Sequence, residues 1–143
     1  MPIMVEAAIW AALKSRIDTL ATDPPMTAYE PGEKITAGSD AYGPLPYIIV
    51  GDSRNANDRI TIAGDTHIYS GTALLTIQWP LARSITHLQL MQIAGAVAAH
   101  FPAGLRMRSG ETLIRTTRAA DVLAPFIDGA IRAVPVRVPW STL

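Results

Sequence analysis

Residues 69–80 read YSGTALLTIQWP, and they carry the strongest strand signal in the chain. Over Thr66–Pro80, smaller polar side chains alternate with larger apolar ones, as on a β-strand whose successive side chains point to opposite faces. Leu74 falls on the opposite face from Ile77, so the pattern leaves open whether one face of this strand is covered or both. Pro80 lacks a backbone donor and ends the strand.

A helix is predicted directly after this strand. Thr86 is a favourable N-cap, because its hydroxyl can accept a hydrogen bond from the first turn. The apolar residues that follow it form a broad helical arc to about Phe101. Gly95 and the neighbouring alanines allow another backbone to approach, and the sequence Phe101-Pro102-Ala103-Gly104 breaks the helix. We expect the helix to lie across the sheet.

A first amphipathic helix is predicted from about Met4 to Ala21, ahead of two consecutive prolines. Trp10 lies beside its apolar stripe, where it either widens the core face or meets a neighbouring subunit. Two polar stretches, Glu30–Pro44 and Ser53–Asp65, predict exposed loops, the second with a possible strand edge at Ile60–Ile62. Further strands are predicted at Thr27–Glu30, Pro46–Val50, Leu105–Arg108, Glu111–Thr117 and Ala130–Trp140.

The last predicted strand follows a hairpin turn signal at Asp128-Gly129. Pro135 and Pro139 withhold donors from a ladder and favour an edge strand. The element order does not alternate as βαβ units do. The sequence therefore predicts one α+β domain over residues 1–143, with a mixed, mainly antiparallel sheet and two helices packed on one face.

The composition favours a protein with neighbours. The 143 residues are 49% hydrophobic and only 17% charged, and a subunit can hide apolar surface that a monomer cannot. Acidic and basic residues balance at 12 each, which argues against sequence-specific nucleic-acid binding and against an anionic membrane surface. The chain has no cysteine and no stretch typical of a signal peptide or a membrane span, so we expect a soluble cytoplasmic product.

No motif in the sequence predicts an active site. The three histidines, His67, His87 and His100, lack partners at metal-ligand spacing. Nucleophile elbows and phosphate-binding glycine loops are also missing from the sequence. We therefore predict no catalytic, cofactor-binding or metal-binding residue and no enzyme activity. The alternative is a small enzyme or ligand-binding domain that uses His67 or His100 with a carboxylate.

Four arginines gather between the second helix and the last strand, and two of them, Arg106 and Arg108, would share one face of a strand. One interpretation is a solvated face, and the other is a surface that meets another subunit or lines a lumen. The four residues are Arg106, Arg108, Arg115 and Arg118.

The segment from Tyr69 to Pro80, with the helix that ends at Ala94–Gly104, resembles the tail terminator (tail completion) proteins of long-tailed phages and gene transfer agents. The opening Val5–Ile9 helix and the Val134–Pro139 strand agree with it. The resemblance implies a homo-oligomeric ring, hexameric in this family, that caps the tail tube, stops its growth and presents a surface to the head-side connector. It also implies a virion protein at the head-proximal end of the tail, assembled in the host cytoplasm, with DNA passing through the ring.

Two sets of contact residues follow as expectations under this resemblance. The polar loop supplies candidates for contact with the tube or connector: Arg54, Asn55, Asn57, Asp58 and Arg59. The arginine region and the predicted C-terminal edge supply candidates for subunit or lumen contact: Arg106, Arg108, Arg115, Arg118 and Trp140. A head-tail connector, a stopper or a minor tail subunit is the alternative within virion structure.

Overall fold

The computed structural model describes residues 4–55, 58–59 and 67–142. The described helices are α1 (Val5–Asp18) and α2 (His87–Ala99). The strands are β1 (Ala28–Tyr29), β2 (Ser39–Asp40), β3 (Gly43–Pro44), β4 (Tyr47–Arg54), β5 (Asp58–Arg59), β6 (His67–Ile68), β7 (Ser70–Pro80), β8 (Arg106–Ser109), β9 (Thr112–Thr116), β10 (Asp121–Val122), β11 (Phe126–Asp128) and β12 (Ile131–Ser141).

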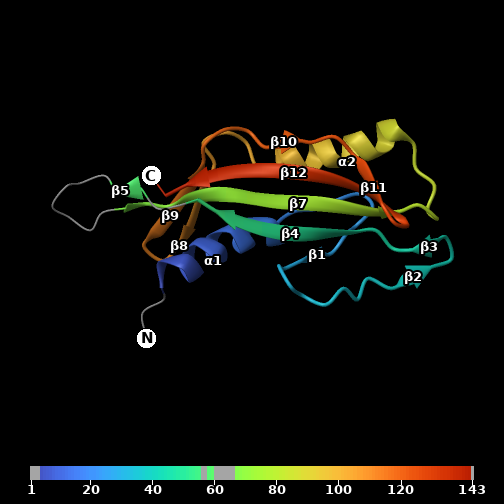
Figure 1. Cartoon of the computed structure of the whole chain (residues 1–143), viewed down its shortest axis with the longest axis horizontal. Helices are drawn as coiled ribbons and strands as arrows, with labels where there is room; N and C mark the ends of the chain where they lie inside the picture. The colour runs from blue at the N-terminus through green and yellow to red at the C-terminus, as the bar shows by residue number, and fades with distance from the viewer. Residues whose placement is uncertain (1–3, 56–57, 60–66, 143) are drawn as a thin grey trace.

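The main sheet has the strand order β1-β4-β7-β12-β9-β8, with β10 and β11 also paired to β12. Only β1 and β4 pair in parallel. The long strands β4, β7 and β12 form the body of the sheet (Figure 1), and β7 pairs with β12 from Ser70 opposite Ser141 to Pro80 opposite Ile131. The predicted α+β class with a mixed, mainly antiparallel sheet is confirmed.

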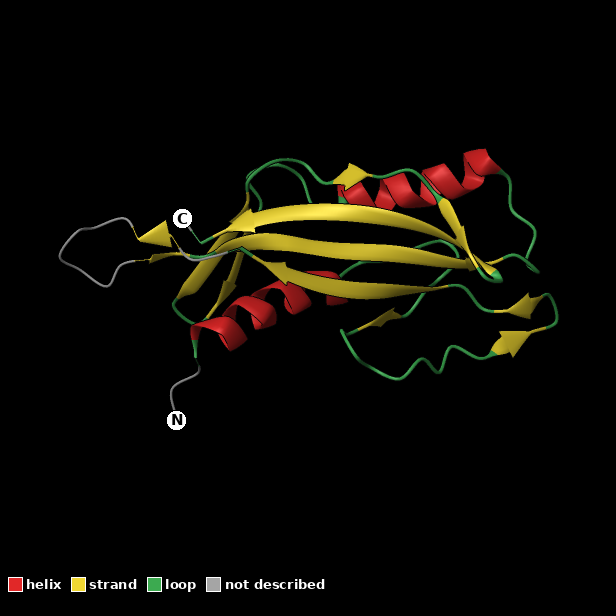
Figure 2. Cartoon of the chain, in the orientation of Figure 1, coloured by secondary structure: helices red, strands yellow, loops and turns green. Residues whose placement is uncertain are grey.

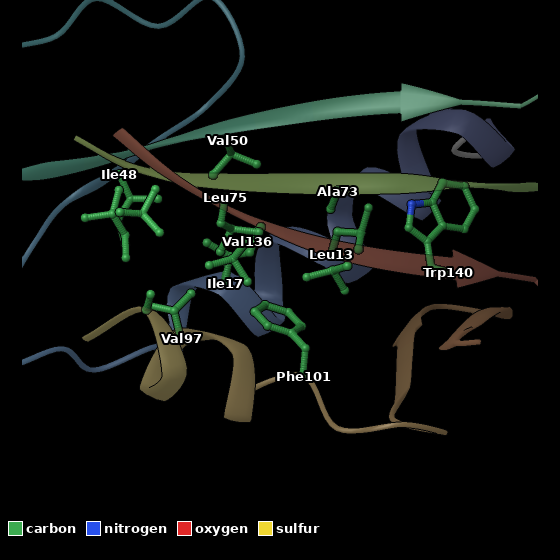
Figure 3. Close-up of a cluster of buried hydrophobic side chains, with 14 of the residues drawn as sticks. Leu13, Ile17, Ile48, Val50, Ala73, Leu75, Val97, Phe101, Val136 and Trp140 are labelled. Carbon is green, nitrogen blue, oxygen red and sulfur yellow. The ribbon is translucent and has the colours of Figure 1, made fainter. Parts of the chain in front are cut away.

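The core lies on one face of this sheet. The register sets Leu75 opposite Val136 and Ile77 opposite Val134, and these side chains are fully buried. Both helices cover this face, so that Leu13 of α1 reaches the same cluster as residues of α2 (Figures 2 and 3). The opposite face of β7, which includes Leu74, is half-buried. The predicted packing of two helices on one face is confirmed. The two faces of β7 differ, because the face with Leu75 and Ile77 is buried and the face with Leu74 is only half-buried.

Each helix is fixed by contacts at its ends. Thr86 caps α2 as predicted, since its hydroxyl accepts from the Gln89 N–H and the Gln89 side chain accepts from the Thr86 N–H. Such a capping box stabilises a helix by about 1 kcal/mol. At the other end, the Arg16 guanidinium donates twice to the His100 carbonyl oxygen, at 3.0 and 2.8 Å. The C-terminal ends of α1 and α2 are thereby joined.

Trp10 of α1 is partly buried and packs against the core cluster. Of its two predicted roles, widening the core face is therefore the one that the structure supports. The buried side chains of α1 follow the predicted four-residue spacing, with Ile9, Leu13 and Ile17 on one side.

The expectation that residues 130–140 form an edge strand is wrong. β12 lies inside the sheet, with β7 along one side for its whole length. Its other side pairs in three separate pieces, which are Ile131–Ala133 with β11, Val136–Arg137 with β10 and Trp140–Ser141 with β9. Pro135 and Pro139 fall in the two gaps between these pieces.

The backbone direction explains how the sheet tolerates these prolines. The Pro135 carbonyl accepts from the Leu123 N–H at 2.9 Å, and the Pro139 carbonyl accepts from the Thr117 N–H at 3.1 Å. The N and O of one strand residue point to the same side, so the missing donors of both prolines face the interrupted side of β12. The ladder between β12 and β7 therefore loses no hydrogen bond. The interrupted side of β12 tolerates proline as an edge strand does.

The predicted loop over Ser53–Asp65 is shorter than expected at its start, because β4 continues to Arg54. Beyond it, β5 and β6 form a separate two-stranded ribbon that projects from the end of the main sheet (Figure 1). The predicted strand edge at Ile60–Ile62 lies outside the described residues. The other loop, Glu30–Pro44, contains the small β2–β3 hairpin.

Candidate partner-binding surfaces

The described residues contain no group of three or more histidine or acidic side chains suited to a metal ion. A cleft of about 570 Å³ lies between residues 21–24 and the face of α2 that carries Gln89 and Ile93. Asp23 is the single ionisable side chain in its lining. The His100 ring nitrogen Nε2 lies 2.9 Å from the Thr19 hydroxyl and from the Arg16 carbonyl oxygen. Within the described residues, the contacts of the His100 ring thus join the two helices and include no ion pair with a carboxylate.

No helix in the described part of the chain is both long enough and apolar enough to span a membrane.

One end of the molecule exposes apolar side chains from four separate segments. The β2–β3 hairpin, the β7–α2 connection, the start of α2 and strand β11 all lie at this end (Figure 1). The Leu81 N–H donates to the Ala130 carbonyl at 2.8 Å, which holds the end of β7 against the turn before β12. We call this surface the apolar end, and its exposed side chains are Tyr42, Leu81, Leu88, Phe126 and Ile127.

Arg83 fixes the β2–β3 hairpin onto this end. Its Nη2 lies 2.6 Å from the Asp40 carboxylate, and its Nε donates to the Pro44 carbonyl at 3.2 Å. The hydrogen bond from Arg83 lowers the pKa of Asp40, with help from the Tyr42 backbone N–H. Tyr42 itself is 78% exposed. Arg83 therefore holds the β2–β3 hairpin in place, and the Tyr42 side chain of this hairpin is exposed to solvent.

The apolar end is not predicted by any pattern in the sequence. Phe126 and Ile127 follow each other in β11, and both are at least half exposed. Two adjacent large apolar residues beside the Asp128-Gly129 turn are the one local signal that could have drawn attention. Tyr42 and Leu88 join them only through the tertiary fold.

The opposite end carries a basic surface on the β8–β9 hairpin. Arg106 and Arg115 are direct partners in the antiparallel register, so they lie on the same face, and Arg108 follows on that face two residues along β8. All three side chains are exposed, and within the described residues none of them takes part in an ion pair. We call Arg106, Arg108 and Arg115 the arginine strip. The prediction that Arg106 and Arg108 share a face is confirmed.

Arg118, the fourth arginine of the predicted set, lies apart from the arginine strip. Its Nη2 lies 3.5 Å from the Asp121 carboxylate, which also accepts from Arg137 at 2.8 Å. The hydrogen bond from Arg137 is the main cause of a lowered pKa for Asp121, and the charge of Arg118 lowers it further. Because Arg137 belongs to β12, Asp121 ties strand β10 to the centre of the sheet.

Asp121 is expected to make stability depend on pH. A carboxyl group whose pKa is lower in the folded chain stabilises the fold above the ordinary pKa of about 3.9, and this stabilisation is lost as the pH falls through the lower, folded pKa. Asp121→Asn should therefore lower the thermal midpoint at pH 7, and the difference from the natural chain should shrink below about pH 4. Circular dichroism melts across pH 3–7 measure this. Asp128→Asn is the control, since Asp128 has no ion-pair partner in the described part of the chain; equal pH profiles for both variants would contradict the assignment.

Trp140 is not available for subunit contact in this structure, contrary to the expectation. It is 1% exposed and lies among the core side chains at the end of β12. The Arg54 guanidinium carbon lies 5.2 Å from the centroid of its ring, a distance that suits a cation–π interaction. Trp140 is buried because β12 lies inside the sheet and this side chain points to the face that the helices cover.

The five polar loop candidates differ in what the structure shows of them. Arg54 is bound within the chain, because it pairs with Asp52 at 2.9 Å and donates to the Glu6 carbonyl of α1 at 3.3 Å. The Asn55 amide donates to the Ser70 hydroxyl at 3.1 Å. Asp58 and Arg59 are the two residues of strand β5, and Asn57 lies outside the described residues. Asn55 thus holds the ends of β4 and β7 together, and Arg54 joins the end of β4 to α1.

A family model described as phage tail terminator protein matches residues 8–140. The chain belongs to the phage tail terminator family. Among solved structures, one chain with 20% sequence identity superposes with a TM-score of 0.68, covering 94% of this chain and 95% of that one. The name of that protein states no function, and at this identity it supports the fold alone. No curated protein matched the sequence.

Membership in the tail terminator family confirms the resemblance drawn from the β7 and α2 sequences. It gives the chain a structural role in a phage tail. The matched range contains both the apolar end and the arginine strip. A tail terminator of this fold thus exposes two chemically different surfaces at opposite ends of one sheet (Figure 1).

Proposed function

We propose that this chain forms a ring, of six subunits by resemblance to the family, that caps the tail tube at its head-proximal end. In this proposal the ring stops polymerisation of the tube protein and offers its other side to the head-side connector. The family match over residues 8–140 is the observation that carries the proposal. The protein would assemble with the tail in the host cytoplasm.

The distribution of exposed side chains supports an assembly role. A ring stacked between two different partners needs two different surfaces on every subunit. Permanent interfaces are more apolar than transient ones, and the apolar end exposes Leu88 at 72% and Ile127 at 66%. We assign the apolar end to the contact with the tail tube, which is the permanent contact in this proposal.

The test is a tube-capping assay with purified tail-tube protein from the same particle. Tubes polymerise alone or with the terminator, and negative-stain electron microscopy gives their length distribution. The natural chain should produce short tubes, each ending in a ring. Leu88→Ser combined with Phe126→Ser should return tube lengths to the uncapped distribution, because the substitutions remove exposed apolar contact area.

Met4→Ser is the matched control, since Met4 is 71% exposed but lies at the other end of the molecule near the N-terminus. It should cap tubes like the natural chain. Circular dichroism melts should show all variants folded. Normal capping by the Leu88 and Phe126 variant would refute the assignment of the apolar end, and a natural chain that binds heads but never tubes would refute tube capping itself.

A further inference from the structure

The arginine strip brings exposed cations together without an ion pair in the described residues. Arg106 and Arg115 lie directly opposite each other on neighbouring strands, where like charges destabilise a sheet. Four other arginines in the described residues donate hydrogen bonds to oxygens of the chain, and Arg118 forms an ion pair with Asp121; the four are Arg16, Arg54, Arg83 and Arg137. The fold keeps an unfavourable pair of cations that internal acceptors do not neutralise.

Hydrogen-bonding side chains continue the arginine strip across the sheet. Arg115 lies opposite Ser141 of β12, and Ser141 lies opposite Ser70 of β7. Partners in an antiparallel register share a face, so the row Arg106, Arg115, Ser141 and Ser70 crosses four strands on the face that the helices leave uncovered. The next residues on this face are Pro139 and Thr72. No carboxylate stands in this row of the described sheet.

In a second copy of the chain, part of the acidic side chains is already engaged. Several carboxylates are already paired within the chain, including Asp40 with Arg83, Asp52 with Arg54 and Asp121 with Arg137. Charge complementarity therefore points away from self-association through this surface and toward a different, strongly anionic partner.

We propose that the arginine strip binds the phosphate backbone of duplex DNA without reading base sequence. Arginine, serine and threonine side chains are the donors that commonly contact phosphate oxygens. Contacts of this kind to phosphate oxygens position a protein on DNA and carry no direct sequence information. The proposal rests on the proposed function, because a ring at the head-proximal end of a tail surrounds the path of the DNA. Repetition around the ring multiplies a contact that the zero net charge of one subunit keeps weak.

The experiment measures fluorescence anisotropy of a fluorescein-labelled duplex titrated with the full chain in its native oligomeric state. Titrations at several salt concentrations between about 50 and 200 mM give the slope of log K against log salt. The natural chain should bind two duplexes of unrelated sequence equally. The triple variant Arg106→Gln, Arg108→Gln, Arg115→Gln should bind at least about tenfold more weakly at the lowest salt, with the slope reduced by about one unit for each arginine lost.

Arg118→Gln and Arg132→Gln are matched controls, since each removes one arginine outside the strip, and both should bind DNA like the natural chain. The triple variant should keep its melting temperature or gain slightly, because it removes the repulsion between Arg106 and Arg115. Unchanged DNA affinity in the triple variant would overturn the proposal. Tighter binding of polyglutamate than of duplex DNA would also overturn it, by assigning the strip to an acidic protein surface.

The tube-capping assay separates this proposal from the proposed function. The triple variant should still cap tubes, because the apolar end is untouched. Loss of DNA binding with capping retained supports both proposals. DNA binding that depends on the strip in a protein that caps no tubes would refute the proposed function alone.

Discussion

Gly71→Ala is expected to destabilise the fold by about 3 kcal/mol, at the upper end of the range for overpacked sites. A Cβ atom at Gly71 would overlap the Ser53 carbonyl oxygen and would lie 2.9 Å from Cζ2 of Trp140. The carbonyl belongs to the backbone of β4, and Trp140 is held in the core. Since 1 kcal/mol shifts the melting temperature of a domain this size by about 3 °C, the midpoint should fall by about 10 °C.

Gly51→Ala is the control for this prediction. Gly51 also lies in the β4–β7 ladder, but a Cβ there would meet Leu74 at 3.7 Å, an ordinary contact distance. The same change in side chain should therefore shift stability by no more than about 0.5 kcal/mol. Thermal melts of both variants decide the matter. Equal melting temperatures would mean that the Ser53 carbonyl and the Trp140 ring leave room for a Cβ atom at Gly71, against this prediction.

Phe101→Ala is expected to cost about 3–5 kcal/mol, because a large aromatic side chain is removed from a site with 0% exposure. Phe101 directly follows α2 and packs among residues of both helices and the sheet (Figure 3). The loss would open a cavity where the two helices meet. Urea or thermal unfolding followed by circular dichroism measures the change in the free energy of unfolding.

The chain contains one other phenylalanine, which provides the matched variant. Phe126 is 50% exposed in β11, so Phe126→Ala should change the free energy of unfolding by less than about 1 kcal/mol. The two substitutions thus separate folding from assembly, since Phe126 belongs to the proposed tube contact and Phe101 to the core. A destabilisation of similar size in both would contradict this division.

Local sequence signals predicted the elements well. The long alternating strand ends at Pro80 and Thr86 caps α2, as predicted, and the two predicted hairpin turns form one residue later than expected, at Gly110-Glu111 and Gly129-Ala130. In these turns Gly110 and Gly129 have positive φ values of 60° and 61°, the conformation that glycine adopts at little cost. These features depend on residues a few positions apart, which is why the sequence alone indicates them.

Strand order was harder to predict, because it depends on pairing between distant segments. Pro135 and Pro139 predict an edge strand, yet β12 lies inside the sheet, and the missing donors of both prolines face the gaps on its interrupted side. The residues alone do not reveal that one side of a strand can be continuous while the other is interrupted. The expectation that Trp140 is available for subunit contact depends on the same edge position, and Trp140 is buried because β12 is not at the edge.

The candidate surfaces were predicted in part. Alternation along β8 correctly placed Arg106 and Arg108 on one face, and the register added Arg115. Arg118 was grouped with them by sequence proximity, but its partner Asp121 lies three residues away on the next strand. The apolar end escaped prediction because its members come from segments as distant as Tyr42 and Ile127.

The central position of β12 sets a condition on synthesis. Until residues 131–141 have left the ribosome, one whole side of β7 lacks its partner, and Val134, Val136 and Val138 are missing from the core. Pairing between such distant segments is slow compared with helix formation. A nascent or prematurely released chain therefore carries an open strand edge, which favours capture by chaperones or degradation.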